Sequence, residues 1–173
     1  MKRSIFILRM LFVILSACSP AIDTTRPDDF SLTYHWQEGS LPPPYHYEYT
    51  IAIQPDGQGQ IEMLPDYPSD QTPVWKEVFT ITEDDLDQLY ALLLENDFFQ
   101  TNWAAQSDPP IGGSSEQLTV TAQGAEYTIP SFVVANQQNA ASEVMAAINA
   151  LVPQDIWDRL DLQREQYMEE HQE

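Results

Sequence analysis

The stretch FSLTYHW, residues 30–36, decides the fold class, because large apolar and polar side chains alternate along it. Successive side chains of a β-strand point to opposite faces of a sheet, so this alternation predicts a strand with one buried face. The stretch YEYTIAI, residues 47–53, repeats the pattern after the proline-rich segment EGSLPPP, residues 38–44. Two such neighbours predict an antiparallel pair of strands whose other face contacts water.

The aromatic residues of these two stretches are predicted to belong to the core. Four of them alternate in phase with Leu32 and Ile51, which favours burial over an exposed platform for sugars or peptides: Tyr34, Trp36, Tyr47 and Tyr49. Tyr45 and Trp103 fall in or beside predicted loops. We expect these two rings to be exposed.

Two more strands and a helix are predicted between residues 55 and 96. The turn at residues 55–57, Pro-Asp-Gly, precedes a third short strand around residues 61–63, and VWKEVFTI, residues 74–81, is predicted to be the fourth. Thr82 then has the character of a helix N-cap, and leucines at helical spacing follow it as far as Asn96. This segment has the clearest helical signal in the chain.

The remaining elements complete an α+β order. LTVTA, residues 118–122, and EYTIP, residues 126–130, flank Gln123-Gly124 as a predicted hairpin. A helix is predicted over about residues 137–152, and Pro153 begins another that frays in the charged tail YMEEHQE, residues 167–173. The order ββββ-α-ββ-α-α predicts a single α+β domain over residues 30–173, an antiparallel β-sheet with helices packed on one face.

The first 17 residues have the zones of an export signal. Lys2, Arg3 and Arg9 are basic, and residues 10–15 form an unbroken apolar run. A transmembrane helix needs about 20 apolar residues, so this run is too short to serve as a permanent anchor. We therefore predict a signal peptide over residues 1–17.

The chain's only cysteine, Cys18, directly follows that run. Leu15-Ser16-Ala17-Cys18 resembles the lipobox of bacterial lipoproteins. The resemblance covers residues 1 to about 19 and implies cleavage before Cys18, with diacylglycerol on its sulfur and an acyl group on its nitrogen. It implies a protein anchored on the extracytoplasmic side of the cell membrane, or of the outer membrane where the host has one. The alternative is an ordinary secretory signal with an incidental cysteine.

Residues 18–29 are predicted to be a linker, because they contain two prolines and no apolar periodicity. Three of the seven Lys and Arg residues lie in the predicted signal, so four remain against 27 Asp and Glu, a formal net charge of −23. Such an acidic surface repels the phosphates of nucleic acids, which excludes them as partners. The expected partners are the membrane, through lipid on Cys18, and an envelope protein or a small ligand.

Two groups of side chains are candidates for metal binding. His35, His46 and Glu48 fall on the polar face of the predicted hairpin, and two imidazoles with a carboxylate suit zinc or copper. Polar residues on the wet face of a strand pair are also what the alternation itself predicts. The acidic run at residues 83–87 suggests calcium, but helix capping and the helix dipole explain it equally well, and the spacing of an EF-hand loop is absent.

The sequence contains no motif of a known catalytic class. Gly-x-Ser-x-Gly, a glycine-rich phosphate loop and Ser-x-x-Lys are all absent, and Gly112-Gly113 is explained by loop geometry. We therefore expect no cofactor and predict a lipid-anchored extracytoplasmic domain that acts as a binding or envelope-interaction module. The alternative is a cell-surface hydrolase or metal-dependent enzyme, and an inhibitor or assembly factor differs from the first prediction only in its partner.

Overall fold

The computed structural model describes residues 24–171, so the predicted signal peptide and Cys18 lie outside the described residues. Within that range the predicted α+β fold and element order are confirmed. The strands are β1 (Ser31–Gln37), β2 (Glu48–Ile53), β3 (Gln58–Leu64), β4 (Trp75–Thr80), β5 (Ser115–Ala122) and β6 (Ala125–Ile129). The helices are α1 (Glu83–Glu95), α2 (Gln138–Ala150), which follows a short 3-10 turn at Ala135–Gln137, and α3 (Gln154–His171).

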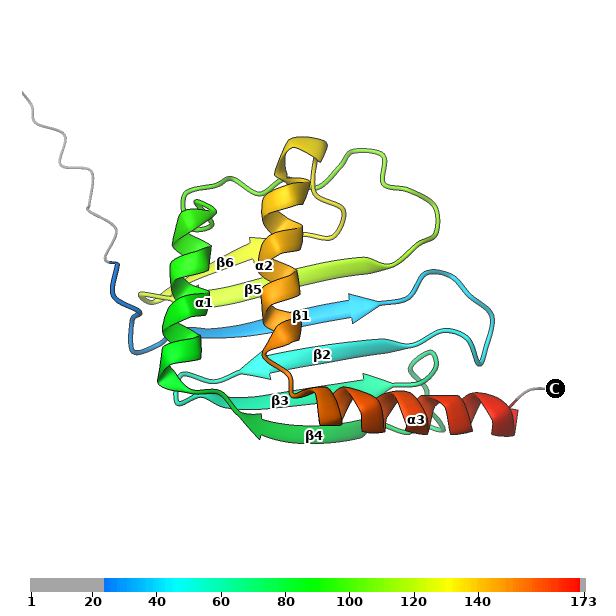
Figure 1. Ribbon diagram of the computed structural model, residues 1–173. Helices are drawn as coiled ribbons and strands as arrows, with labels where there is room; N and C mark the ends of the chain where they lie inside the picture. The colour runs from blue at the N-terminus through cyan, green and yellow to red at the C-terminus, as the bar shows by residue number, and fades with distance from the viewer. Residues whose placement is uncertain (1–23, 172–173) are drawn as a thin grey trace, which may run out of the picture.

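All six strands form one antiparallel sheet in the order β4-β3-β2-β1-β5-β6 (Figure 1). The predicted hairpin of β1 and β2 is therefore the centre of the sheet, with Tyr34 opposite Ile51. β1 also pairs along its whole length with β5, and β6 closes that side through the tight turn at Gln123-Gly124. Both turn residues have positive φ, 55° and 72°, as a two-residue hairpin turn of the primed type requires.

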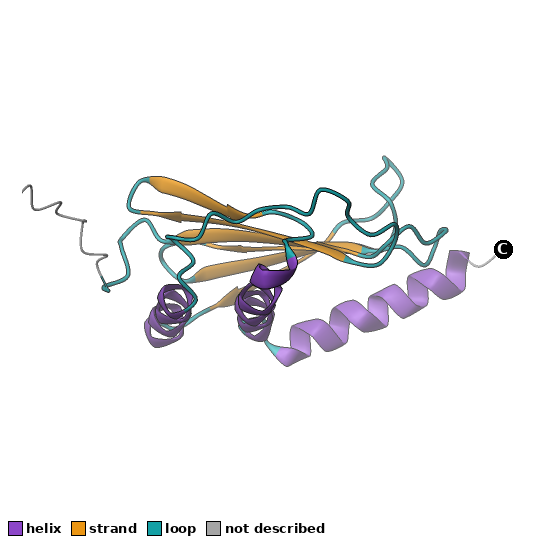
Figure 2. Cartoon of the chain, turned by 90° about the horizontal axis from the view of Figure 1, so that it is seen from above, coloured by secondary structure: helices purple, strands orange, loops and turns teal. Residues whose placement is uncertain are grey.

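The helices lie on one face of the sheet (Figure 2), as predicted. The core between the two layers contains the apolar side chains of the strands together with Leu86, Leu93, Val144 and Ile148 of the helices, all fully buried. α3 lies on the same face and runs alongside β3 and β4, where Tyr167 makes an edge-to-face contact with Trp75. None of the helices within residues 24–171 combines the length and the apolar character that a membrane-spanning segment requires.

The predicted burial of the four aromatic rings is confirmed, but one of the two rings that we expected to be exposed packs on the core. Tyr34 and Tyr49 are buried, and Trp36 and Tyr47 are half-buried against the same core. Tyr45 is exposed, as expected. Trp103 is not, because its indole packs on the core and its Nε1 donates to the carbonyl of Phe98 at 3.0 Å.

Thr82 is the N-cap of α1, as predicted. Its hydroxyl oxygen accepts a hydrogen bond from the backbone N–H of Asp85 at 3.1 Å and donates to the Asp85 carboxylate at 2.7 Å. The helix ends at the predicted stop, Asn96.

Replacing Thr82 with alanine is expected to lower the free energy of unfolding by about 1 kcal/mol, because the backbone N–H of Asp85 then loses its hydrogen-bond acceptor. Urea denaturation checks this, and Thr82→Ser, which keeps the hydroxyl, should restore most of the loss.

The C-terminal helices differ in detail from the prediction. The apolar spacing predicts that Val144, Ala147, Ile148 and Leu151 point inward. In α2, Val144 and Ile148 are buried, and Ala141 and Met145 complete the buried stripe. Ala147 is only half-buried. α3 continues to His171, through most of the segment that we expected to fray, and the contact of Tyr167 with Trp75 shows what this last part packs against.

Candidate functional site

A cleft of about 470 Å³ opens at the end of the sheet where β1 ends and β2 and β5 begin. Three loops meet there, residues 38–47, 65–74 and 107–114. The lining combines polar side chains with glycine, proline and aromatic rings: Gln37, Glu38, Gly39, Ser40, His46, Glu48, Tyr67, Pro68, Pro110, Gly112, Gly113, Ser115 and Phe132. Volumes of 300–1,000 Å³ are typical of sites for small ligands or inserted side chains.

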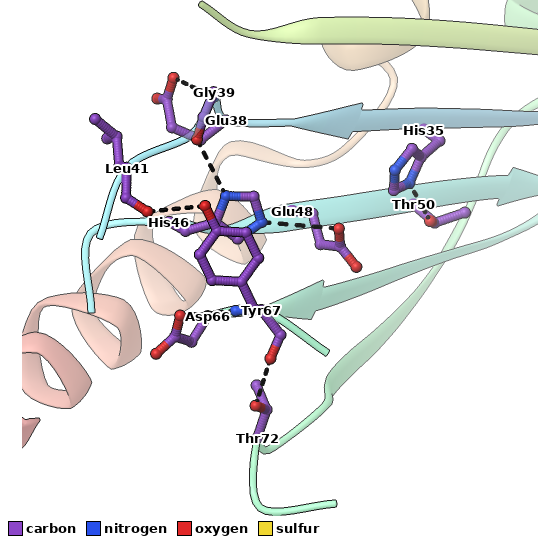
Figure 3. A network of polar contacts seen from close by, with 10 residues as sticks. All are labelled: His35, Glu38, Gly39, Leu41, His46, Glu48, Thr50, Asp66, Tyr67 and Thr72. Atoms are coloured by element: carbon purple, nitrogen blue, oxygen red, sulfur yellow. Dashed lines mark hydrogen bonds and ion pairs between the residues drawn. The ribbon is translucent and has the colours of Figure 1, made fainter. Parts of the chain in front are cut away.

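His46 lies at the centre of the cleft and is 4% exposed (Figure 3). Its Nδ1 is 3.3 Å from the carbonyl oxygen of Gly39. Because a carbonyl can only accept a hydrogen bond, Nδ1 carries the proton, and in the neutral ring Nε2 then has a lone pair. Within residues 24–171, Nε2 has no hydrogen-bond partner, and it lies 3.9 Å from the carboxylate oxygen Oε2 of Glu48. In the neutral ring, therefore, an acceptor nitrogen faces the Glu48 carboxylate.

Tyr67 covers the imidazole from the neighbouring loop. The two rings stack with their centroids 3.9 Å apart and an interplanar angle of 3°. The Tyr67 hydroxyl donates to the carbonyl of Leu41 at 2.8 Å, and its own carbonyl accepts from the Thr72 hydroxyl at 2.7 Å (Figure 3). Loops 38–47 and 65–74 are therefore joined across His46, and the ring is held in one orientation.

The third loop is positioned by a close approach of two glycine backbones. A Cβ atom added at Gly39 would lie 2.6 Å from the backbone nitrogen of Gly113 and 2.7 Å from its carbonyl oxygen. Backbone atoms cannot yield as a flexible side chain can, so only glycine at position 39 permits this packing. The contact brings the 107–114 loop against the mouth of the cleft.

Gly39→Ala is accordingly expected to displace residues 110–115 and to widen the cleft. Amide hydrogen exchange in that segment should become faster, because the added methyl group separates the two loops. Gly124→Ala is the control, since a Cβ there meets nothing within 4 Å even though the φ of +72° strains it. Unchanged exchange at residues 110–115 in Gly39→Ala would show that the loops are not packed as described.

The three metal candidates of the hairpin do not converge. His46 and Glu48 are neighbours in the cleft, but His35 lies opposite Thr50 in the sheet, and its Nδ1 is 3.1 Å from the Thr50 hydroxyl (Figure 3). Within residues 24–171, no group of three or more His, Cys, Asp and Glu side chains is arranged to hold a metal ion. A zinc site normally takes at least three protein ligands, so the pair alone does not make one.

The acidic residues at the start of α1 are engaged by protein groups. Asp85 accepts from the Thr82 hydroxyl, and the carboxylates of Glu83 and Asp87 both pair with Arg26. The guanidinium Nε lies 2.7 Å from Asp87 Oδ1. Capping and ion pairing therefore account for the acidic run at residues 83–87 without calcium.

A second cavity of about 410 Å³ lies on the other side of the 107–114 loop, against the first turns of α2. The carboxylate of Glu116 lies at its wall, on the helix-covered face of β5. Burial raises the pKa of Glu116, and a hydrogen bond from the Tyr34 hydroxyl opposes that rise. Burial likewise raises the pKa of Tyr34 to about 12. Tyr34 and Glu116 thus interact on the helix-covered face of the sheet, each with a pKa raised by burial.

Sequence reasoning missed Tyr67, which lines the cleft, and Glu116, which lines the second cavity. Glu116 could have been found, because it alternates in phase with Leu118 and Val120 and so places a carboxylate on an apolar face. Tyr67 lies in the proline-rich loop 65–74, where no periodicity predicts a contact.

No family model matches the chain, and a search of curated proteins found no match to it.

Proposed function

We propose that this chain is a lipid-anchored, extracytoplasmic binding module that uses the cleft around His46 to hold a protein of the cell envelope. The observation that carries the binding role is the buried Nε2 of His46, which has no donor within the described residues. A buried polar atom without a partner costs free energy, about 1–3 kcal/mol, that a bound donor recovers. Such atoms are rare in folded proteins and call for an explanation, which a bound ligand supplies here.

The anchor is supported by the sequence of residues 15–18, which resembles a lipobox. Two or three acyl chains on one residue hold a protein at a bilayer far more firmly than one chain does. A net charge of −23 after cleavage keeps the domain away from anionic lipid headgroups, so the lipid and not the protein surface makes the membrane contact.

The position of the tether relative to the cleft supports a partner that approaches from outside the membrane. Arg26 is fixed to α1 by its ion pairs, and Asp29 accepts from the backbone N–H groups of Gln123 and Gly124 at 2.8 and 2.6 Å. The chain therefore enters the domain at the start of β1, whereas the cleft lies beyond the end of β1 (Figure 1). A seven-residue strand separates these ends by about 23 Å. An anchored domain thus presents its cleft away from the lipid.

Chemical crosslinking on intact cells, followed by purification and mass spectrometry, tests the proposed function. Glu48→Gln is the test variant, since it removes a charge from the cleft and keeps the shape of the side chain. Glu126→Gln is its control, because Glu126 is exposed on the edge strand β6, away from the cleft. We expect one reproducible envelope protein with the wild type and with Glu126→Gln, and its loss with Glu48→Gln. Equal recovery from both variants would contradict a binding role for the cleft.

A further inference from the structure

We infer that the gap between His46 and Glu48 recognises a primary ammonium group, the end of a lysine side chain on the bound protein. This inference rests on the proposed function and names the chemistry of the contact. It starts from the hydrogen-bonding capacity of the two side chains that face each other in the cleft.

Both groups that border the gap are acceptors. The Nδ1 proton of His46 is donated to the Gly39 carbonyl at 3.3 Å, which leaves Nε2 of the neutral ring as an acceptor, and no residue that the structure describes donates a hydrogen bond to the Glu48 carboxylate. Their separation of 3.9 Å is too long for a direct hydrogen bond. An ammonium nitrogen beside the gap can lie about 2.9 Å from both acceptors and donate one N–H to each, and the bond to the carboxylate is then charge-assisted.

The ligand reaches the gap from the Glu48 side. Nε2 is hidden from solvent, whereas the Glu48 side chain is 15% exposed and lines the cleft, so a ligand meets the carboxylate first and needs a movement of that side chain to reach Nε2. The ring of Tyr67 and the neighbouring Pro68 offer an apolar wall for the methylene groups of a lysine. A lysine side chain therefore fits the cleft with its stem on that wall and its charge at the gap.

The charge of the site selects a cation. Glu38 lines the same cleft, and no Lys or Arg is among the described residues that line it. Glu38 Oε1 accepts from the backbone N–H of Gly39 at 3.0 Å, which holds a second carboxylate at the cleft. The overall charge of the domain adds a long-range attraction for basic surfaces. A protein partner with an exposed lysine is attracted both by the carboxylates of the cleft and by the net negative charge of the domain.

Two other occupants of the gap make different predictions. A proton on Nε2 would turn His46 into an imidazolium paired with Glu48, and a cation would then be repelled. A zinc ion would have two protein ligands only, below the three that its sites normally use. The measurement below distinguishes these occupants from an ammonium group.

The test is a titration of the full chain in detergent micelles, followed by the ¹⁵N signals of its labelled histidines. The probe is Nα-acetyl-lysine amide, and its matched control is Nα-acetyl-norleucine amide, which has the same stem without the ammonium group. At pH 7 we expect the lysine derivative alone to shift the Nε2 signal of His46. Glu48→Gln should weaken this binding on the order of tenfold or more, because a charge-assisted hydrogen bond is lost, and Glu126→Gln should leave it unchanged.

Each contrary result overturns the inference in a recognisable way. Equal shifts with the norleucine derivative would show that the site is apolar. Protonation of His46 at Nε2 in the free protein would show that a proton occupies the gap. A response to Zn²⁺ alone would show that a metal ion occupies it. Failure of the lysine derivative to bind, together with loss of the envelope protein in Glu48→Gln, would reject the ammonium group and keep the binding module. n-Butylamine distinguishes the source, since tighter binding of the lysine derivative indicates a protein lysine and equal binding a free amine.

Discussion

Replacing Cys18 with alanine is expected to leave the protein without lipid and to remove it from the membrane fraction. The proposed anchor puts diacylglycerol on this sulfur, because residues 15–18 resemble a lipobox, and the chain has no second cysteine that could take its place. Each buried methylene contributes about 0.8 kcal/mol to membrane binding, so the loss of two or three acyl chains abolishes partitioning into the bilayer. Metabolic labelling with a tagged fatty acid and fractionation of the cells measure both effects.

The control for this change is Ser19→Ala, which alters the next residue and keeps the sulfur. We expect it to be acylated and to stay with the membrane. Intact-mass spectrometry of the wild type should give a chain that begins at Cys18 and carries the added lipid. Normal acylation of Cys18→Ala would refute the assignment, and an unmodified chain cut elsewhere would favour an ordinary secretory signal.

Replacing Ile51 with alanine is expected to lower the free energy of unfolding by about 2–5 kcal/mol. Ile51 is fully buried in β2, between Tyr34 of β1 and Ile61 of β3 in the register of the sheet. Strands on both sides and helices above hold the site, so the cavity left by the shorter side chain cannot collapse. Because domains of this size are stable by only about 5–15 kcal/mol, the loss is a large fraction of the total.

Urea denaturation followed by tryptophan fluorescence measures this loss. Ile51→Val removes one methylene and should cost about 0.5–1.5 kcal/mol, which gives the graded response expected of a packed site. Ile111→Ala is the surface control, since Ile111 is fully exposed in the 107–114 loop and its truncation should change stability little. A loss at position 51 no larger than at position 111 would show that the sheet is not packed as described.

The fold could be predicted from the sequence because local patterns and tertiary burial agree. The alternation of residues 30–36 and 47–53 fixed both the strands and the buried face, and the N-cap character of Thr82 fixed the start of α1. Where burial depends on long-range packing, prediction failed. Trp103 lies in a loop by sequence, yet its ring rests on the core and its Nε1 donates to the Phe98 carbonyl. Nothing in the residues around it signals that contact.

The cleft was predictable only in part, because the sequence does not show which residues lie opposite each other in the sheet or where β2 begins. The sequence placed His35, His46 and Glu48 on one polar face, but His46 precedes β2 and lies in the loop, while His35 pairs with Thr50 in the middle of the sheet. The partner of His46 is Tyr67, which reaches it from a different loop. Which ring nitrogen carries the proton follows from the Gly39 carbonyl, a backbone group that no sequence pattern locates.

The claim that a partner binds at the cleft is tested most directly by site-specific photocrosslinking in cells. A photoreactive amino acid replaces Ser40, an exposed residue of the cleft, or Val78, which is exposed on β4 at the far edge of the sheet. The account predicts an envelope protein crosslinked from position 40 and not from position 78, with the adduct reduced by Glu48→Gln. Adducts of equal yield from both positions, or from position 78 alone, would contradict it.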